Sequence, residues 1–137
     1  MKRLDNLIRV RTWQLNESRR RVTELELSIE STRSRIQSLE RSIEAEGRLA
    51  DEAGVGSDFA AWAVAARDRR EKLNATLETL DEELRQARDA VAEAFQELKK
   101  FELVQDARRQ RDRAVANHRE QFRLDEMAAL RHRGSNR

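Results

Sequence analysis

The stretch "ADEAGVGSDF", residues 50–59, separates two regions that each carry a helical pattern. Gly54 and Gly56 lie within it, and glycine readily adopts the backbone conformations that a tight turn requires. Ser57 or Asp58 can then cap a new helix by accepting a hydrogen bond from its first free N–H groups. We therefore expect a single hairpin domain over residues 1–137, with a first helix at about 2–51, a turn at about 52–57, a second helix at about 58–131 and a disordered tail at about 132–137.

A row of aliphatic side chains runs along the first helix at every seventh position. Its members are Ile8, Leu15, Val22, Ile29, Ile36 and Ile43. This spacing places them on one face of a helix, where a coiled-coil partner buries them. The companion row is apolar at Leu4, Leu25 and Leu39 but polar at Arg11, Ser18, Thr32 and Glu46. The sequence therefore predicts a seam that is incompletely sealed.

The second helix carries two apolar rows that match those of the first helix. One row contains Leu73, Leu80, Ala87, Ala94 and Phe101, and the other contains Leu77, Leu84, Val91 and Leu98. When the chain folds at the glycines, residues whose numbers sum to 109 lie opposite each other, so that Ile29 meets Leu80 and Leu25 meets Leu84. Several layers pair a large side chain with a small one, which lets two helices approach closely.

These rows predict an all-α fold: a long, two-helix, antiparallel coiled-coil hairpin with a protruding C-terminal helix end, monomeric when free. A parallel homodimer through the same rows is the alternative. The glycine break and the match between the two helices favour the hairpin.

The composition agrees with long helices rather than with a layered core. Of the 137 residues, 39% are charged, 4% are aromatic and none is proline or cysteine. A chain this charged could be disordered, but the seven-residue rows argue against that. The absence of cysteine excludes disulfides, thiolate nucleophiles and zinc–sulfur sites. Asp5 and Arg9 stand where a signal peptide needs an apolar run. The longest apolar run, residues 59–66, is too short to cross a bilayer. We therefore expect a cytoplasmic protein.

The pairing rule leaves the C-terminal part of the second helix without a partner in the chain. Leu4 pairs near Gln105, so residues from about 109 to 131 extend past the first helix. The seam row turns polar there and then becomes apolar again, as expected of a helix that packs against another protein. The residues that we assign to this contact are Val115, Arg119, Phe122, Arg123, Met127, Ala129, Leu130, Arg131 and Arg133. A frayed tail with scattered apolar residues is the alternative.

A second candidate surface lies at the start of the second helix. Phe59, Trp62, Ala66 and Leu73 share one helix face by their spacing, and the last two already have partners in the predicted seam. This leaves Phe59 and Trp62 as the candidate binding pair near the turn. The alternative is that both rings are buried against the first helix.

The sequence offers no constellation of residues for catalysis, a metal or a cofactor. The segment "GVGSD" lacks the lysine and the length of a phosphate-binding loop, and His118 and His132 are single residues without metal-ligand spacing. A hairpin also has no concave pocket to shift the pKa of its carboxylates. We therefore expect no enzyme, no catalytic residue, no metal and no cofactor.

The arginines between residues 108 and 119 raise the possibility of nucleic-acid binding. They point around the helix, acidic residues lie among them, and no aromatic stacking platform accompanies them. We therefore expect no nucleic acid as a partner, and a basic nucleic-acid-binding or structural coiled coil stays the alternative.

Four segments carry a family resemblance. The first is "RLDNLIRVR", with paired aliphatics before an arginine, and the second is "GSDFAAWAVAARD", with aromatics at the start of the second helix. The third, "ARDAVAEAFQELKKFELV", is an Ala/Arg-rich stretch that leads to Lys99, Lys100, Glu102 and Leu103. The fourth, "REQFRLDEMAALR", fits a Glu-Gln-x-x-(Leu/Met)-Asp-Glu-x-Ala ending through Glu120, Gln121, Leu124, Asp125, Glu126 and Ala128. The lysine segment is more closely spaced than the family's Lys-x-x-Glu-x-Leu. Over nearly its whole length the chain resembles the FliJ family, the small coiled-coil components of the bacterial flagellar type III export apparatus.

The resemblance implies a stalk similar in shape to the central gamma subunit of rotary ATPases. It implies insertion of the C-terminal contact residues into the ring of the flagellar export ATPase, stimulation of that ATPase, and contacts with the export gate membrane protein and with export chaperones. Phe59 and Trp62 are the residues that we assign to the export gate. The implied place is the cytoplasmic face of the inner membrane, through the export apparatus. A stalk protein of a virulence type III secretion system is the alternative.

Overall fold

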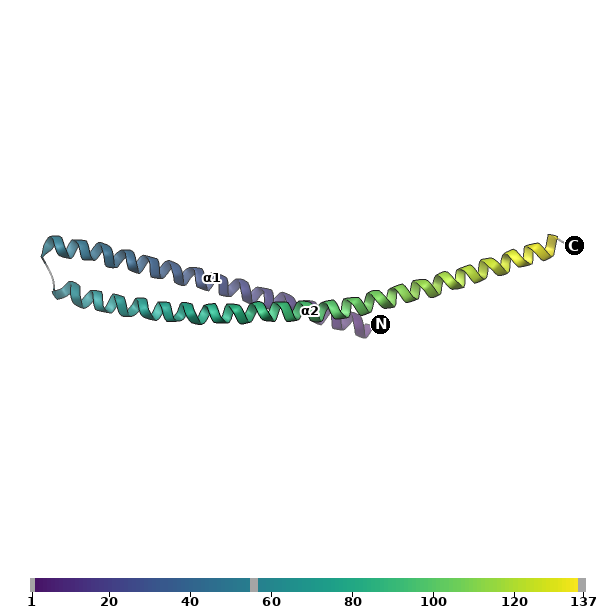
Figure 1. The fold of residues 1–137 in the computed structure, drawn as a ribbon, viewed down its shortest axis with the longest axis horizontal. Coiled ribbons are helices and arrows are strands. Elements are labelled where there is room, and N and C mark those ends of the chain that lie inside the picture. The colour runs from purple at the N-terminus through teal and green to yellow at the C-terminus, as the bar shows by residue number, and fades with distance from the viewer. Residues whose placement is uncertain (1, 55–56, 136–137) are drawn as a thin grey trace. The chain divides into compact units, whose positions relative to one another are not determined.

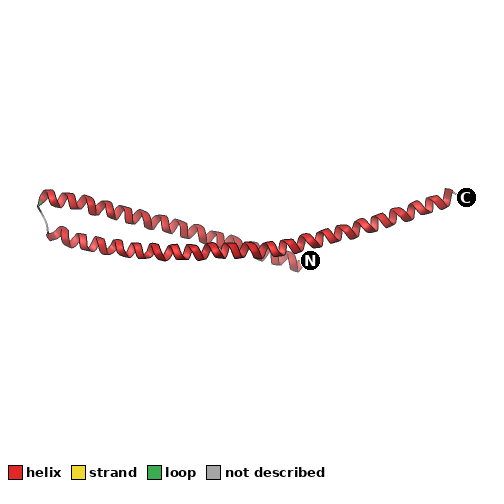
Figure 2. Cartoon of the chain, viewed as in Figure 1, coloured by secondary structure: helices red, strands yellow, loops and turns green. Residues whose placement is uncertain are grey.

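A computed structural model describes residues 2–54 and 57–135, which are helical except at the turn (Figure 2). Helix α1 spans Lys2–Ala53 and contains 52 residues. Helix α2 spans Ser57–Ser135 and contains 79 residues. The two helices run antiparallel and pack against each other, and the described residues include no strand (Figure 1). The predicted all-α hairpin is confirmed.

The first helix ends where the backbone of Gly54 leaves the right-handed region. The φ angle of Gly54 is +70°, a conformation that costs residues with a side chain about 1–2 kcal/mol and that commonly closes helices at a glycine. The second helix begins at Ser57 with Asp58 in its first turn, where a carboxylate interacts favourably with the helix dipole. The helix therefore begins close to the expected residue 58. The second glycine assigned to the turn, Gly56, lies outside the described residues.

At the other end, α2 runs past the expected boundary at Arg131. It continues to Ser135, with His132 and Arg133 in its last turn, and a positive charge there favours the helix C-terminus. The hydroxyl of Ser135 donates a 2.9 Å hydrogen bond to the carbonyl of His132. Residues 132–135 are thus helical where we expected a disordered tail, and the rest of that tail, residues 136–137, lies outside the described residues.

The chain packs as two compact units. One unit is Trp13–Ala94, and the other combines Met1–Thr12 with Phe95–Arg137. In the first unit, the buried cluster consists of Leu25, Ile29, Leu84 and Ala87, with Val22, Leu77 and Leu80 packed against it. This cluster contains both members of three expected pairs, namely Val22 with Ala87, Leu25 with Leu84, and Ile29 with Leu80. The packing of this unit agrees with the predicted pairing.

Ion pairs between the helices flank this cluster. Arg21 lies 3.4 Å from Glu83, and Arg88 lies 3.9 Å from Glu26. Their side chains are largely exposed, and exposed pairs typically contribute under ~1 kcal/mol each. Burial of a single large aliphatic side chain contributes about 1.5–3 kcal/mol. The apolar cluster therefore supplies most of the stability of this unit, and the ion pairs mainly help to fix which residues lie opposite each other.

Polar side chains occupy some seam positions without being left unpaired. Thr32 is buried, and its hydroxyl donates a 2.8 Å hydrogen bond to the carbonyl of Ser28 in the preceding turn. In the other unit, the guanidinium carbon of Arg11 lies 5.6 Å from the centre of the Phe101 ring, within the range of a cation–π interaction. Two of the polar seam positions expected from the sequence, Arg11 and Thr32, are therefore accommodated by contacts of their own.

Every residue that we assigned to the coiled-coil seam is at least half-buried. Leu15, Ile29, Leu84 and Leu98 are buried. Those that are half-buried are Ile8, Val22, Ile36, Ile43, Leu73, Leu80 and Phe101. The half-buried majority reflects a two-helix pair, in which each seam residue keeps one edge open to solvent.

Candidate protein-interaction site

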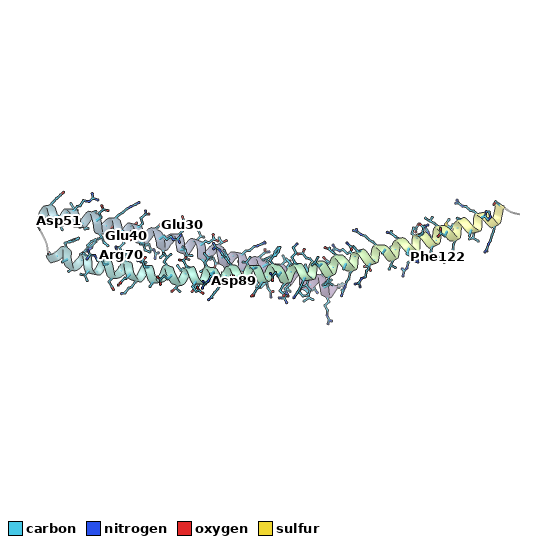
Figure 3. All side chains as sticks on the ribbon, viewed as in Figure 1. Glu30, Glu40, Asp51, Arg70, Asp89 and Phe122 are labelled. Carbon is cyan, nitrogen blue, oxygen red and sulfur yellow. The ribbon has the colours of Figure 1, made fainter. Side chains whose placement is uncertain are left out.

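The C-terminal part of α2 is exposed along its whole described length. Every residue from Asp106 to Ser135 is exposed, whereas Leu4 and Leu98 in the same unit are buried. The side chain of Phe122 projects from an uncovered helix (Figure 3) and is 61% exposed. We define residues 106–135 as the C-terminal segment. No other helix of the described structure covers it.

The residues assigned to a partner contact in this segment all lie at its surface. The large apolar ones are strongly exposed: Val115, Phe122, Met127 and Leu130. Ala129 and the four assigned arginines, at positions 119, 123, 131 and 133, are exposed as well. Arg123 forms a 2.8 Å ion pair with Glu120, one turn earlier on the same helix. The segment therefore offers apolar area and positive charge together.

These apolar side chains do not form one narrow stripe. Each residue of an α-helix turns the chain by about 100°, so Val115 and Ala129 lie within about 20° of the direction of Phe122. On the same scale Leu130 lies about 80° away and Met127 about 140° away. Leu124, which is 49% exposed, lies on the side opposite Phe122. We did not include Leu124 from the seven-residue row, because that row follows only one side of the helix.

At the start of α2, the two assigned aromatic rings lie together. The ring centres of Phe59 and Trp62 are 6.0 Å apart, and the rings are inclined by 30°. Phe59 is half-buried against α1, and a methyl group added at Gly47 would lie 3.4 Å from its Cζ. Trp62 is 38% exposed. The structure thus packs one ring and leaves the other available, between the two alternatives drawn from the sequence.

An open groove along the same unit was not expected from the sequence. It has a volume of about 770 Å³ and is lined by Ser31, Ser34, Arg35, Ser38, Leu39, Ser42, Arg69 and Leu73. The serines of α1 are too small to cover the edges of Leu39 and Leu73, which stay half-buried. The signal in the sequence is the recurrence of serine at spacings of three and four, the repeat of one helix face.

Many of the ion pairs on the described helices join residues three or four positions apart. Arg85 donates a hydrogen bond to Glu82, and this contact lowers the pKa of the Glu82 carboxyl from its ordinary value. Within residues 2–54 and 57–135, no three His, Asp or Glu side chains gather closely enough to hold a metal ion. No helix in this described part has an apolar stretch long enough to span a bilayer.

Comparison with known proteins identifies the family. A family model described as "Flagellar FliJ protein" matches residues 1–137, the whole chain. The comparison with curated proteins found no match, and neither did the comparison with solved structures. Members of the matched family are non-enzymatic components related to flagellar export. The resemblance read from the sequence motifs is confirmed, and the chain belongs to the FliJ family of flagellar proteins.

Proposed function

We propose that this protein is the stalk of the flagellar export ATPase. Its C-terminal segment enters the central opening of the ATPase ring and stimulates hydrolysis, while the hairpin contacts the export gate and substrate chaperones. The observation that carries this proposal is the continuation of α2 past Gln105 as a helix that is exposed at every residue to Ser135. A helix whose apolar side chains are left uncovered by the described part of its own chain is suited to binding another protein.

The balance of forces in this segment favours its apolar residues as the main source of affinity. Full burial of a side chain such as Phe122 contributes about 1.5–3 kcal/mol. An exposed arginine pair usually contributes under ~1 kcal/mol. The arginines instead accelerate and orient association with an acidic partner. We therefore assign affinity to Phe122 and its apolar neighbours, and steering to Arg119, Arg123, Arg131 and Arg133.

The hairpin end near the turn supplies the proposed contact with the export gate. Trp62 has the larger uncovered ring, and Phe59 stacks against it at 6.0 Å between ring centres. Packing of Phe59 against Gly47 holds the pair in place from the side of α1. A partly exposed tryptophan supported by a packed ring is a common kind of anchor in protein interfaces.

The decisive experiment measures binding to the export ATPase and stimulation of its hydrolysis. Phe122→Ala should reduce both by about tenfold or more, since ~1.4 kcal/mol corresponds to a factor of ten. Phe95→Ala is the matched control, because Phe95 is also an exposed phenylalanine of α2, 43% exposed, but lies outside the C-terminal segment. It should leave stimulation unchanged.

Two results would contradict the proposal. Normal stimulation by Phe122→Ala would remove the C-terminal segment from the interaction and favour a frayed helix end. Salt-sensitive DNA binding that persists at physiological salt would support the nucleic-acid alternative instead, because such binding depends on the release of counterions from phosphates.

A further inference from the structure

Two strongly exposed apolar side chains lie on opposite sides of the C-terminal segment. Phe122 is 61% exposed and Leu124 is 49% exposed. Two residues of α-helix turn the chain by about 200°, so these side chains point in nearly opposite directions. Met127, 44% exposed, lies about 60° from Leu124 on the same scale. Leu124 and Met127 therefore form a second apolar face behind Phe122.

This two-sided pattern is confined to one part of the segment. Residues 106–114, "DARRQRDRA", contain no large apolar side chain. A helix that packs against one surface carries a single apolar stripe, whereas a helix with apolar side chains all round is covered on several sides. Between Val115 and Leu130 the large apolar side chains point in directions that span about 200° around the helix, which is too wide for a single stripe, although the stretch is fully exposed here. Its partner must therefore reach it from more than one side.

Charge indicates what kind of partner this is. The C-terminal segment contains eight arginines and five acidic residues, and one of the acids, Glu120, is already engaged by Arg123 at 2.8 Å. A second copy of this chain would place the same arginines against each other. An acidic partner would neutralise them. The row of every seventh residue runs from Phe101, which is half-buried in the hairpin, through the polar Arg108 to Val115 and Phe122, so the proposed contact lies on the helix face that already forms the seam.

We propose that Leu124 and Met127 form a second anchoring face, and that two separate apolar elements of the ATPase ring, bordered by acidic side chains, hold the helix from opposite sides. This inference rests on the proposed function. It adds Leu124 to the binding residues and replaces contact along one stripe by contact on two faces. The polar residues 106–114 then connect the hairpin to the clamped stretch without contributing apolar contact.

The test is a binding titration of the full-length chain against the flagellar export ATPase of the same organism, assembled as a ring. Leu124→Ala should weaken binding by about fivefold or more and Phe122→Ala by about tenfold or more. The double variant should weaken it by about the product of the two factors, as expected of independent contacts. Leu27→Ala is the matched control, because Leu27 is also an exposed leucine, 63% exposed, but lies on α1 outside the C-terminal segment. Alanine has the highest helix propensity, so circular dichroism should show unchanged helicity in every variant.

The outcomes separate this inference from the function on which it rests. If Phe122→Ala weakens binding and Leu124→Ala does not, the contact is one-sided, and the clamp is wrong while the stalk proposal stands. If neither variant weakens binding, both are wrong. If sedimentation shows a dimer that the two substitutions abolish, the occupant is a second copy of this chain, which overturns the acidic clamp.

Discussion

The side-chain amide of Gln105 donates a 2.7 Å hydrogen bond to the carboxylate of Asp5, joining residues that are 100 positions apart. Leu4, beside Asp5, is buried, and every described residue after Gln105 is exposed. This pair therefore marks the boundary on α2 between the part that is covered by α1 and the part that is exposed. The apolar rows predict that Gln105 lies opposite Leu4, so the observed partner, Asp5, differs from the expected one by a single residue.

The pairing of the helices can be tested by crosslinking. Cysteines introduced at Ile29 and Leu80 should form a disulfide within one molecule, because both side chains belong to one packed cluster and a disulfide requires close approach of the Cβ atoms. The chain contains no other cysteine. Ile29→Cys with Ala66→Cys is the control, since Ala66 lies about 21 Å from Leu80 along the helix. Crosslinked dimers without any intramolecular product would instead indicate the parallel homodimer.

Two glycines should respond to alanine in opposite ways. Gly47 lies inside α1, and its new methyl group would lie 3.4 Å from the Phe59 ring, so Gly47→Ala should raise the free energy of unfolding by about 0.5–1 kcal/mol through helix propensity. Gly54 has a φ of +70°, so Gly54→Ala should lower it by about 1–2 kcal/mol. Denaturant titration measures both. Destabilisation by Gly47→Ala would mean that the Phe59 ring is held too tightly to accept the methyl group.

The paired rings near the turn should separate stability from binding. Trp62→Ala should weaken binding to the export gate with little loss of helicity, because the ring is 38% exposed. Phe59→Ala should lower the free energy of unfolding by about 1–2 kcal/mol, less than the 3–5 kcal/mol of a fully buried phenylalanine. Thermal melting and gate binding should be measured on the same samples. A Trp62→Ala protein that melts much earlier but binds normally per folded molecule would make Trp62 a core residue.

Neutralising the last two assigned arginines should change the salt dependence of binding more than its strength. Arg131→Gln with Arg133→Gln should reduce ATPase affinity by less than Phe122→Ala does, because exposed charge pairs are weak and are screened by salt. The association rate should fall, and its dependence on salt should become shallower. Stopped-flow measurements across a salt series test this. An affinity loss larger than that of Phe122→Ala, unchanged by salt, would show that these arginines make buried contacts.

The sequence was sufficient for the hairpin because its signals are periodic. The aliphatic row from Ile8 to Ile43 specifies a buried helix face, and the glycines near residue 54 specify where the chain reverses. The match between Ile29 and Leu80 then fixes the pairing to within about a residue. Each of these signals depends on spacing alone, which a sequence displays directly.

The features that were missed depend on geometry outside the seven-residue rows. Leu124 lies opposite Phe122 only when each residue is placed by its helical angle. The packing of Arg11 over Phe101 depends on a side-chain conformation that no spacing reveals. Helicity beyond Arg131 was not expected, and Gly134 lies within α2 although glycine commonly ends a helix. The contacts of the C-terminal segment and of Trp62 with partners stay predictions, because they depend on the surfaces of other proteins.

The unbroken helix between Phe101 and Phe122 has a mechanical consequence. No proline or glycine interrupts this stretch, so neighbouring turns stay linked by backbone hydrogen bonds and cannot swivel freely. The direction in which Phe122 points from the helix axis is therefore fixed relative to that of Phe101, which packs in the hairpin. A ring that grips Phe122 also sets the direction in which this end of the seam faces. Any torque on the gripped end would reach the paired end as rotation, with no hinge between them to absorb it.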